Sequence, residues 1–240
     1  AEPISGAVPL PSWHPDACAS EAKLLAQLAV IDAAGTLALQ HAEGDFVAPL
    51  SLAELEAALA ADPTATLLAG GTDIGLWVTK QSRKLGNVIF LGRIGELARI
   101  DESSSGLEIG AAVTLEDAFT ALLRHYPEAT ELCRRFGSRP IRNAGTLCGN
   151  IANGSSIGDS MPALIALGAR VRLRLAGATR ELALEDMYPP DRRRLLAPGE
   201  FVQAVVIPSR PARPAPRQTI GTIADGFHFR AWKVSKRHDQ

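Results

Sequence analysis

The chain has 240 residues, of which 46% are hydrophobic and 21% charged, and it is long enough to bury a substantial core. Its formal net charge is -1, from 25 basic and 26 acidic residues, so it lacks the basic excess of most nucleic-acid-binding proteins. No apolar run approaches the roughly 18–20 residues that span a bilayer, and the first residues lack the pattern of a signal peptide. We therefore expect a cytoplasmic protein that binds neither nucleic acid nor membrane.

The cysteines and histidines are few and scattered. An odd count of three cysteines, at positions 18, 133 and 148, argues against a disulfide framework and fits a reducing compartment. No CxxC pair exists, and none of the five histidines lies at metal-ligand spacing from a cysteine or from another histidine. Because structural metal sites need such ligands at close spacing, we expect no zinc or iron–sulfur cluster in this chain.

In the first half of the chain the pattern alternates between helix and strand. Residues 1–20 contain four prolines and are expected to be an extended leader, followed by a short helix over residues 21–33. The capping box from Ser51 to Glu54 predicts a helix through Ala61. Short apolar strands are expected at residues 66–69 and 87–91, with a helix at 74–78 between them. This order is typical of an α/β fold.

The second half repeats the mixture. We predict a strand at residues 107–113, a helix that Thr114 caps and that reaches His125, and a further helix from Pro127 to about Phe136. Another helix is expected at 161–167, with Asp159 as its N-cap and Gly168 at its end. Strands at 171–175 and 201–207 complete this part. A proline-containing linker at 209–217 and a strand at 227–234 follow.

A first stretch suited to ligand binding runs from Leu67 to Asp73. An apolar strand leads into Gly70 and Gly71, then a hydroxyl and a carboxylate. Glycines adopt positive φ and let backbone N–H groups approach phosphate oxygens closely. The alternative is a tight turn that merely ends the strand. The stretch is neither a GxGxxG fingerprint nor a P-loop.

A second stretch, from Arg139 to Ser160, is too long and too polar for a simple turn. It offers many amide, hydroxyl and backbone donors and a carboxylate at Asp159, which suit a polar, multi-ring cofactor. Loops of this length usually have a function. A disordered linker is disfavoured because large aliphatic residues recur through it, at Ile141, Leu147, Ile151 and Ile157.

These two stretches together carry a resemblance to a known family. Gly145–Leu167, which reads GTLCGNIANGSSIGDSMPALIAL, resembles the FAD-binding loop of the xanthine dehydrogenase and carbon monoxide dehydrogenase flavoprotein family. Leu68–Asp73 resembles that family's other flavin loop, in the same order and at a matching separation. Ser138–Asn143 and Phe229–Arg237 are similar to the xanthine dehydrogenase branch. The resemblance covers roughly residues 45–240.

The resemblance implies a PCMH-type FAD-binding fold, in which two small α/β subdomains grip an extended FAD. It places a linker at residues 1–44, after an iron–sulfur domain that is missing here. The two FAD-binding subdomains then occupy residues 45–95 and 96–210. Residues 211–240 would be a linker and the start of a truncated C-terminal subdomain. The absence of the rest of that subdomain leads us to expect weak flavin retention by this chain.

The resemblance also implies residue roles. Leu67–Ile74 would wrap the pyrophosphate, Phe136 would lie near the flavin or adenine end, and Lys233 near the flavin ring edge. Four polar residues would hydrogen-bond the rest of FAD. The full cofactor-binding set is Leu67, Leu68, Ala69, Gly70, Gly71, Thr72, Asp73, Ile74, Phe136, Thr146, Asn150, Asn153, Asp159 and Lys233. No catalytic or metal-binding residue is expected.

The family implies an electron-transfer module of a xanthine dehydrogenase-type molybdenum hydroxylase, an oxidoreductase of purine catabolism. Electrons would pass from iron–sulfur clusters through FAD to NAD+. The implied partners are a molybdenum-binding large subunit and an iron–sulfur domain, in a hetero-oligomer. Three alternatives stay open: a related hydroxylase with another substrate, an assembly module that has lost flavin, and a self-contained flavin oxidase. Cys148 stands where the family usually has glycine, and we interpret it as a tolerated small residue.

Overall fold

The computed structural model describes residues 21–32, 35–154, 158–189 and 195–209. The chain forms two units, Ala1–Leu37 and Ala38–Gln240. The described part of the first unit is mainly helix α1, Glu21–Asp32, as predicted, and its Leu24, Leu28 and Val30 are exposed. No helix in the described ranges combines the length and the hydropathy of a bilayer-spanning segment.

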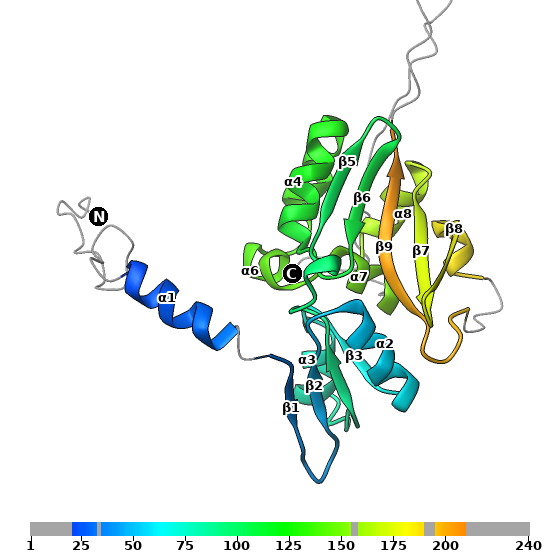
Figure 1. The fold of residues 1–240 in the computed structure, drawn as a ribbon. Coiled ribbons are helices and arrows are strands. Elements are labelled where there is room, and N and C mark those ends of the chain that lie inside the picture. The colour runs from blue at the N-terminus through cyan, green and yellow to red at the C-terminus, as the bar shows by residue number, and fades with distance from the viewer. Residues whose placement is uncertain (1–20, 33–34, 155–157, 190–194, 210–240) are drawn as a thin grey trace, which may run out of the picture. The chain divides into compact units, whose positions relative to one another are not determined.

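A four-stranded sheet occupies the early part of the second unit (Figure 1). Its strands follow the order β1-β2-β4-β3 and comprise β1 (Leu37–Leu39), β2 (Phe46–Ala48), β3 (Thr66–Leu68) and β4 (Val88–Phe90). Strand β4 runs parallel to both β2 and β3. Parallel neighbours need crossover connections, and α2 (Leu52–Ala61) and α3 (Ile74–Thr79) lie in these connections.

Helix α2 begins where the sequence predicts. The Ser51 hydroxyl accepts a hydrogen bond from the Glu54 amide at 3.2 Å, and the Glu54 carboxylate accepts one from the Leu50 amide at 2.8 Å. Leu55 and Leu59, one turn apart, are buried on the face of the helix that meets the core. The helix ends at Ala61, before the Asp62–Pro63 pair.

The later part of the unit is built on a five-stranded antiparallel sheet. Its order is β5-β6-β9-β7-β8, from β5 (Ile100–Ser103), β6 (Gly106–Gly110), β7 (Arg170–Leu175), β8 (Ala178–Ala183) and β9 (Phe201–Pro208). All the pairings in this sheet are antiparallel. The inner face is apolar, and Ile109, Val171, Leu173, Val205 and Ile207 are fully buried there.

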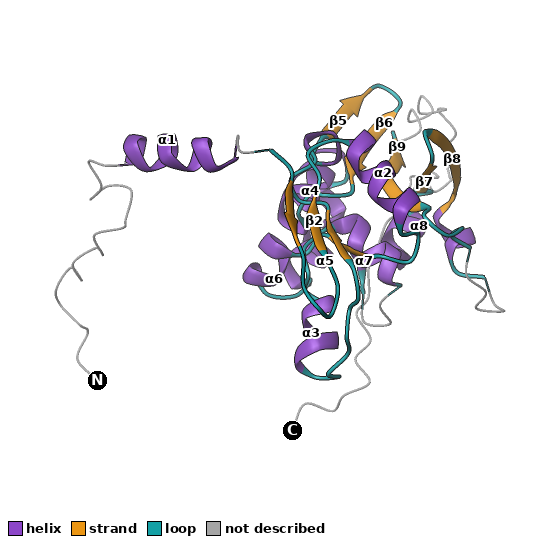
Figure 2. Cartoon of the chain, turned by 60° about the horizontal axis from the view of Figure 1, so that its bottom comes forward, coloured by secondary structure: helices purple, strands orange, loops and turns teal. Residues whose placement is uncertain are grey.

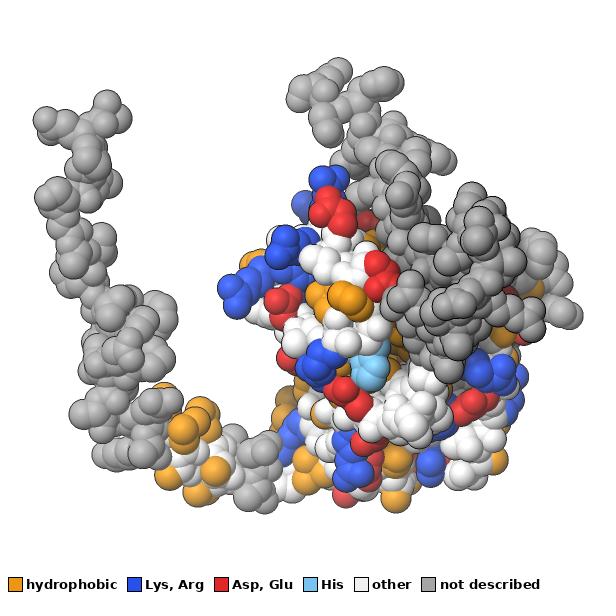
Figure 3. All heavy atoms as spheres, turned by 90° about the horizontal axis from the view of Figure 1, so that it is seen from above, with side chains coloured by type: hydrophobic (Ala, Val, Ile, Leu, Met, Phe, Trp, Pro, Cys, Tyr) orange, Lys and Arg blue, Asp and Glu red, His pale blue; other side chains and the backbone are white. Residues whose placement is uncertain are grey.

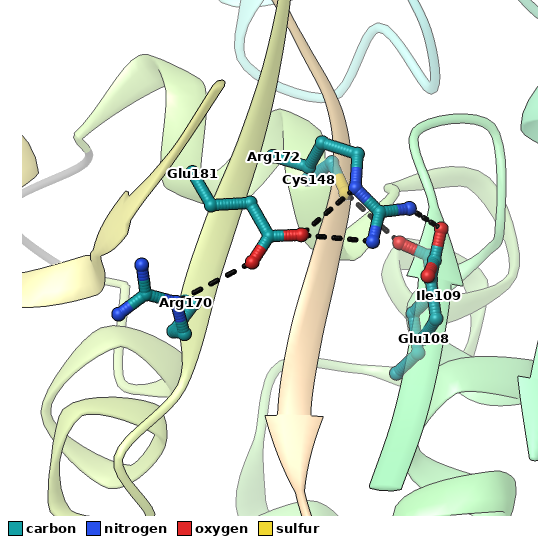
Figure 4. Close-up of polar contacts among 6 residues, drawn as sticks. All are labelled: Glu108, Ile109, Cys148, Arg170, Arg172 and Glu181. Carbon is teal, nitrogen blue, oxygen red and sulfur yellow. Dashed lines mark hydrogen bonds and ion pairs between the residues drawn. The ribbon is translucent and has the colours of Figure 1, made fainter. Parts of the chain in front are cut away.

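The outer face of this sheet is charged (Figure 4). Arg172 on β7 pairs with Glu181 on β8 at 2.8 Å and with Glu108 on β6. Arg170 also contacts Glu181. The hydrogen bond from Arg172 lowers the pKa of the Glu181 carboxyl. These ion pairs stay within one sheet.

Helices cover the inner face, and Figure 2 shows them as purple ribbons among the orange strands. Helices α4 and α7 pack against β6, and α7 also packs against β9. The helices of this part are α4 (Leu115–His125), α5 (Thr130–Arg135), α6 (Arg139–Ala144), α7 (Leu147–Asn153) and α8 (Ser160–Ala166), and short 3₁₀ turns are η2 (Gly95–Leu97), η3 (Pro127–Ala129) and η4 (Leu184–Met187). Basic and acidic side chains are interspersed on the surface seen in Figure 3.

The structure confirms the mixed α/β class and most predicted elements, and it corrects three expectations. The polar stretch predicted as one long loop forms helices α6 and α7. The single helix predicted from Pro127 is a 3₁₀ turn followed by α5. Strands β1, β2, β5 and β8 were not predicted, because they are short or, in β8, mostly exposed and without a clear apolar alternation. The predicted linker at 209–217, apart from Ser209, and the strand at 227–234 lie outside the described residues.

Candidate functional site

A cavity of about 720 Å³ lies between the parts of the second unit that carry the two sheets. One wall comes from the end of α2, strand β3, the loop after it and α3. The other comes from α7, Phe136 and the segment that enters β9. Sites for small molecules typically enclose about 300–1,000 Å³, so the cavity is large enough for a sizeable ligand.

The loop after β3 is shaped by two glycines. Gly70 lies directly against the backbone of Ala144, since a Cβ atom on Gly70 would be 1.9 Å from the Ala144 carbonyl oxygen. Gly71 has a φ of +70°, a conformation that side-chain-bearing residues rarely adopt. The Gly71 carbonyl then accepts a hydrogen bond from the Gly75 amide at 2.8 Å, which begins α3. The loop therefore needs both glycines, one for close approach and one for its turn.

Helix α7 presents the polar residues of the opposite wall. It is capped by Thr146, whose buried hydroxyl accepts a hydrogen bond from the Gly149 amide at 3.1 Å. Its other end is Gly154, with a φ of +57°. Leu147, Cys148 and Ile151 are buried, and Asn150, Asn153 and the buried Cys148 line the cavity. The helix is polar on one face because that face meets the cavity.

Two hydrogen bonds fix these asparagines. The Asn153 side-chain amide donates to the Asp73 carboxylate at 2.7 Å and so joins the two stretches that the sequence singled out. The Asn150 side-chain oxygen accepts from the hydroxyl of Ser160 at 2.6 Å. Ser160 is only 1% exposed, so it holds Asn150 from within the core. The cavity thus has side-chain amides that hydrogen bonds hold in place on one side, and the Gly70–Gly71 turn on the other.

The structure brings most of the predicted binding residues together. Those that line the cavity are Leu67, Ala69, Gly70, Gly71, Thr72, Asp73, Ile74, Phe136, Thr146, Asn150, Asn153 and Asp159. Leu68 belongs to the same strand and is not among the lining residues. Lys233 lies outside the described residues.

Asp159 needs a correction to its predicted capping role. It occupies the position before α8, but its backbone is helical, with φ of -75° and ψ of -9°, and its side chain makes no capping hydrogen bond. A side-chain cap needs an extended backbone at that position. Asp159 therefore lines the cavity without capping the helix.

Several lining residues were not predicted from sequence. Trp77 on α3 lines the cavity, and the Arg83 guanidinium stands 4.4 Å from the centre of its ring. Glu200, before β9, also lines it and is paired with Arg180 at 2.7 Å. The hydrogen bond from Arg180 holds the pKa of the Glu200 carboxyl below its usual range. Local sequence gave no signal for Glu200, because its place depends on the pairing of β9.

Cys148 is a core residue. It is 2% exposed, and its thiol lies 3.5 Å from the Ile109 carbonyl oxygen on β6 (Figure 4). Burial raises the pKa of this thiol to about 12, so the thiolate is scarce at neutral pH. These features support the interpretation of Cys148 as a packed small residue and disfavour a nucleophile.

Comparisons of the sequence and of the structure with known proteins agree on one family. Residues 40–210, more than half of the chain, match the model described as the FAD binding domain in molybdopterin dehydrogenase. The nicotinate dehydrogenase FAD-subunit of Eubacterium barkeri is 29% identical over 170 residues, which are 68% of this chain and 57% of that protein. The xanthine dehydrogenase of Drosophila subobscura is 35% identical over 137 residues, 52% of this chain and 10% of that protein.

A solved structure shares the fold. The Cu,Mo-CO dehydrogenase, in a cyanide-inactivated form, superposes with a TM-score of 0.64 and 28% identity, over 70% of this chain and 60% of that one. The chain thus spans only part of the length of each of these relatives. By sequence and by structure it belongs to the family of FAD binding domains in molybdopterin dehydrogenases.

Proposed function

We propose that the cavity binds FAD and that the chain is an electron-transfer module of a molybdenum hydroxylase. One observation carries the proposal. Two stretches about eighty residues apart, each suited to a polar nucleotide, line a single cavity and are joined by the hydrogen bond from Asn153 to Asp73. This arrangement is what a dinucleotide needs, because its phosphates and its hydroxyls must be bound at the same time.

The chemistry of the lining residues fits FAD part by part. The Gly70–Gly71 turn lines the cavity and would offer backbone N–H groups to a pyrophosphate, with the Thr72 hydroxyl as a further donor. Asn150 and Asn153 supply amide groups that suit the hydroxyls of the ribityl chain and ribose. The side chain of Glu200 would repel phosphates, but its ion pair with Arg180 offsets that charge. The residues present therefore fit the cofactor.

Phe136 supplies an aromatic surface for one of the two ring systems. It lies in the cavity wall, and its ring is held edge-on by Phe119 at a centroid distance of 5.2 Å. Leu68 would contribute through its backbone beside the pyrophosphate loop, and Lys233 would lie near the flavin ring edge. When bound, FAD would supply the redox chemistry, and the protein's share is binding, orientation and electrostatics.

At a finer level we propose a xanthine dehydrogenase-type enzyme of the cytoplasm. Electrons would enter from iron–sulfur clusters and leave to NAD+, and substrate oxidation would occur on a molybdenum-binding partner in a hetero-oligomer. The similarity of residues 229–237 to that branch and the 35% identity to a xanthine dehydrogenase support this choice. The similarity to a nicotinate dehydrogenase FAD-subunit supports the alternative, a related hydroxylase with another heterocyclic substrate.

The test is to titrate the purified chain with FAD and with FMN, and to record flavin fluorescence and the visible spectrum. We expect quenching that saturates at one FAD per chain, and weaker binding of FMN, which lacks the adenosine half. The chain alone, given xanthine and NAD+, should form no NADH. Absence of FAD binding would favour the flavin-free assembly module, and xanthine turnover would refute the module assignment.

A further inference from the structure

An ion pair connects the two halves of the second unit close to the cavity. The Glu56 carboxylate on α2 accepts a hydrogen bond from Arg174 Nε at 2.8 Å. The same carboxylate oxygen accepts one from the Gly177 amide at 2.6 Å. Arg174 and Gly177 lie at the β7–β8 turn, and both Figure 1 and Figure 2 show α2 close to β7. Glu56 therefore holds this turn through two separate donors.

The pair is sheltered from solvent. The side chains of Arg174 and Glu56 are 21% and 19% exposed. Fully exposed ion pairs contribute little, because water and salt screen them and flexible side chains lose entropy. A partly buried carboxylate that accepts charged and backbone hydrogen bonds interacts more strongly. The hydrogen bond from Arg174 also lowers the pKa of Glu56, so the carboxylate is charged at neutral pH.

The neighbouring residues connect the pair to both cavity walls. Leu59 and Pro63 follow Glu56 by three and seven residues, and they line the cavity from one side. Gly199 lines it from the other side, and its amide donates to the Pro63 carbonyl at 3.2 Å. Leu175, adjacent to Arg174, also approaches Gly199. A Cβ atom on Gly199 would be 3.6 Å from the Leu175 side chain. The ion pair and the wall residues thus form one packed junction.

From this arrangement we propose that Glu56 and Arg174 are a positioning pair, which holds the two walls of the cavity at the spacing needed to retain FAD. The inference deepens the proposed function, and it rests on FAD binding in this cavity. Neither residue lines the cavity. They act through Leu59, Pro63 and Gly199, which do.

The chain offers a matched control in the Glu181–Arg172 pair (Figure 4). Arg172 lies on β7, two residues before Arg174. The Arg172 side chain is 27% exposed and the Glu181 side chain 32% exposed, close to the values for the junction pair. Both members belong to the five-stranded sheet, so this pair does not connect the two walls. Glu181→Gln removes a comparable carboxylate charge and leaves the junction intact.

The experiment compares Glu56→Gln, Arg174→Gln, Arg174→Lys and Glu181→Gln with the parent, after thermal melting has verified that each is folded. The rate of FAD release is measured by stopped-flow fluorescence after displacement. Because loss of one partner of a sheltered charge pair acts mainly on dissociation, we expect release about fivefold faster or more in both Gln variants of the junction. Arg174→Lys keeps the positive charge but loses the planar guanidinium with its paired donors. Its rate of FAD release should lie between the rates of the two Gln variants and the parent. Glu181→Gln should stay within about twofold of the parent, although it loses stability.

A second readout does not depend on flavin. Hydrogen exchange of the FAD-free protein should be faster over residues 63–77 and 196–202 in Glu56→Gln, and unchanged there in Glu181→Gln. Equal FAD release and equal exchange in these two variants would overturn the positioning pair. Failure of the parent to bind FAD would instead refute the proposed function. In that case the exchange data alone decide whether Glu56 holds the walls together.

Discussion

Gly70→Ala is expected to weaken FAD binding by at least about tenfold, a loss of ~1.4 kcal/mol or more. The added methyl would be 1.9 Å from the Ala144 carbonyl oxygen and 2.6 Å from the Gly145 Cα, and both are backbone atoms that cannot rotate away. The loop after β3 must therefore move away from the segment that leads into α7. That movement separates the groups proposed for the pyrophosphate from those proposed for the rest of FAD.

Gly75→Ala is the matched control for this prediction. Gly75 lies five residues further along, in α3, and a Cβ atom there would meet nothing within 4 Å. Alanine is also the better helix former, so this variant should bind FAD like the parent and melt no lower. Both variants are titrated with FAD by fluorescence quenching, below their melting temperatures. A folded Gly70→Ala protein with parental affinity would disprove the proposed role of the loop.

Ile151→Ala should destabilise the FAD-free protein by ~2–5 kcal/mol, the usual cost of emptying a fully buried aliphatic site. Ile151 is 0% exposed and lies on the face of α7 that packs against the five-stranded sheet. Its carbonyl also accepts a hydrogen bond from the Tyr188 hydroxyl at 2.8 Å. FAD affinity should fall as well, because Asn150 and Asn153 lie on either side of it in the same helix.

Val78→Ala is the control for Ile151→Ala, because it shortens an exposed aliphatic side chain on another helix that lines the cavity. Val78 is 46% exposed on α3, so its truncation should change the free energy of unfolding by no more than about 0.5 kcal/mol. Both variants are unfolded in urea, followed by circular dichroism. If Ile151→Ala were as stable as Val78→Ala, α7 could not be anchored to the sheet in the way the structure shows.

The features that the sequence predicted correctly depend on local chemistry. Ser51 and Thr114 are caps whose hydroxyls accept the expected amide hydrogen bonds, at 3.2 and 3.1 Å. Gly70 and Gly71 marked the cavity loop because only glycine satisfies their close approach and positive φ. The two caps and the positive φ of Gly71 are satisfied within a few residues along the chain, so they leave a readable pattern. The close approach of Gly70 is to the distant Ala144, and the sequence indicated it only through the choice of glycine.

The features that the sequence missed depend on distant partners. Helix α7 was predicted as loop because its cavity face is polar, and only its burial against β9 shows that it is a core helix. Strand β8 is mostly exposed and is defined by its pairing with β7. Glu200 lines the cavity, and Glu56 pairs with Arg174 beside it, through contacts across the fold. No local pattern in the sequence records such contacts.

The most direct test of the central claim is a crystal structure of this protein with FAD bound. The account predicts that the pyrophosphate oxygens lie within hydrogen-bonding distance of the backbone amides of Gly70–Asp73. The rest of the cofactor should extend along Asn150 and Asn153, with one ring system against Phe136. FAD bound elsewhere, or bound with the Gly70–Asp73 loop untouched, would contradict it.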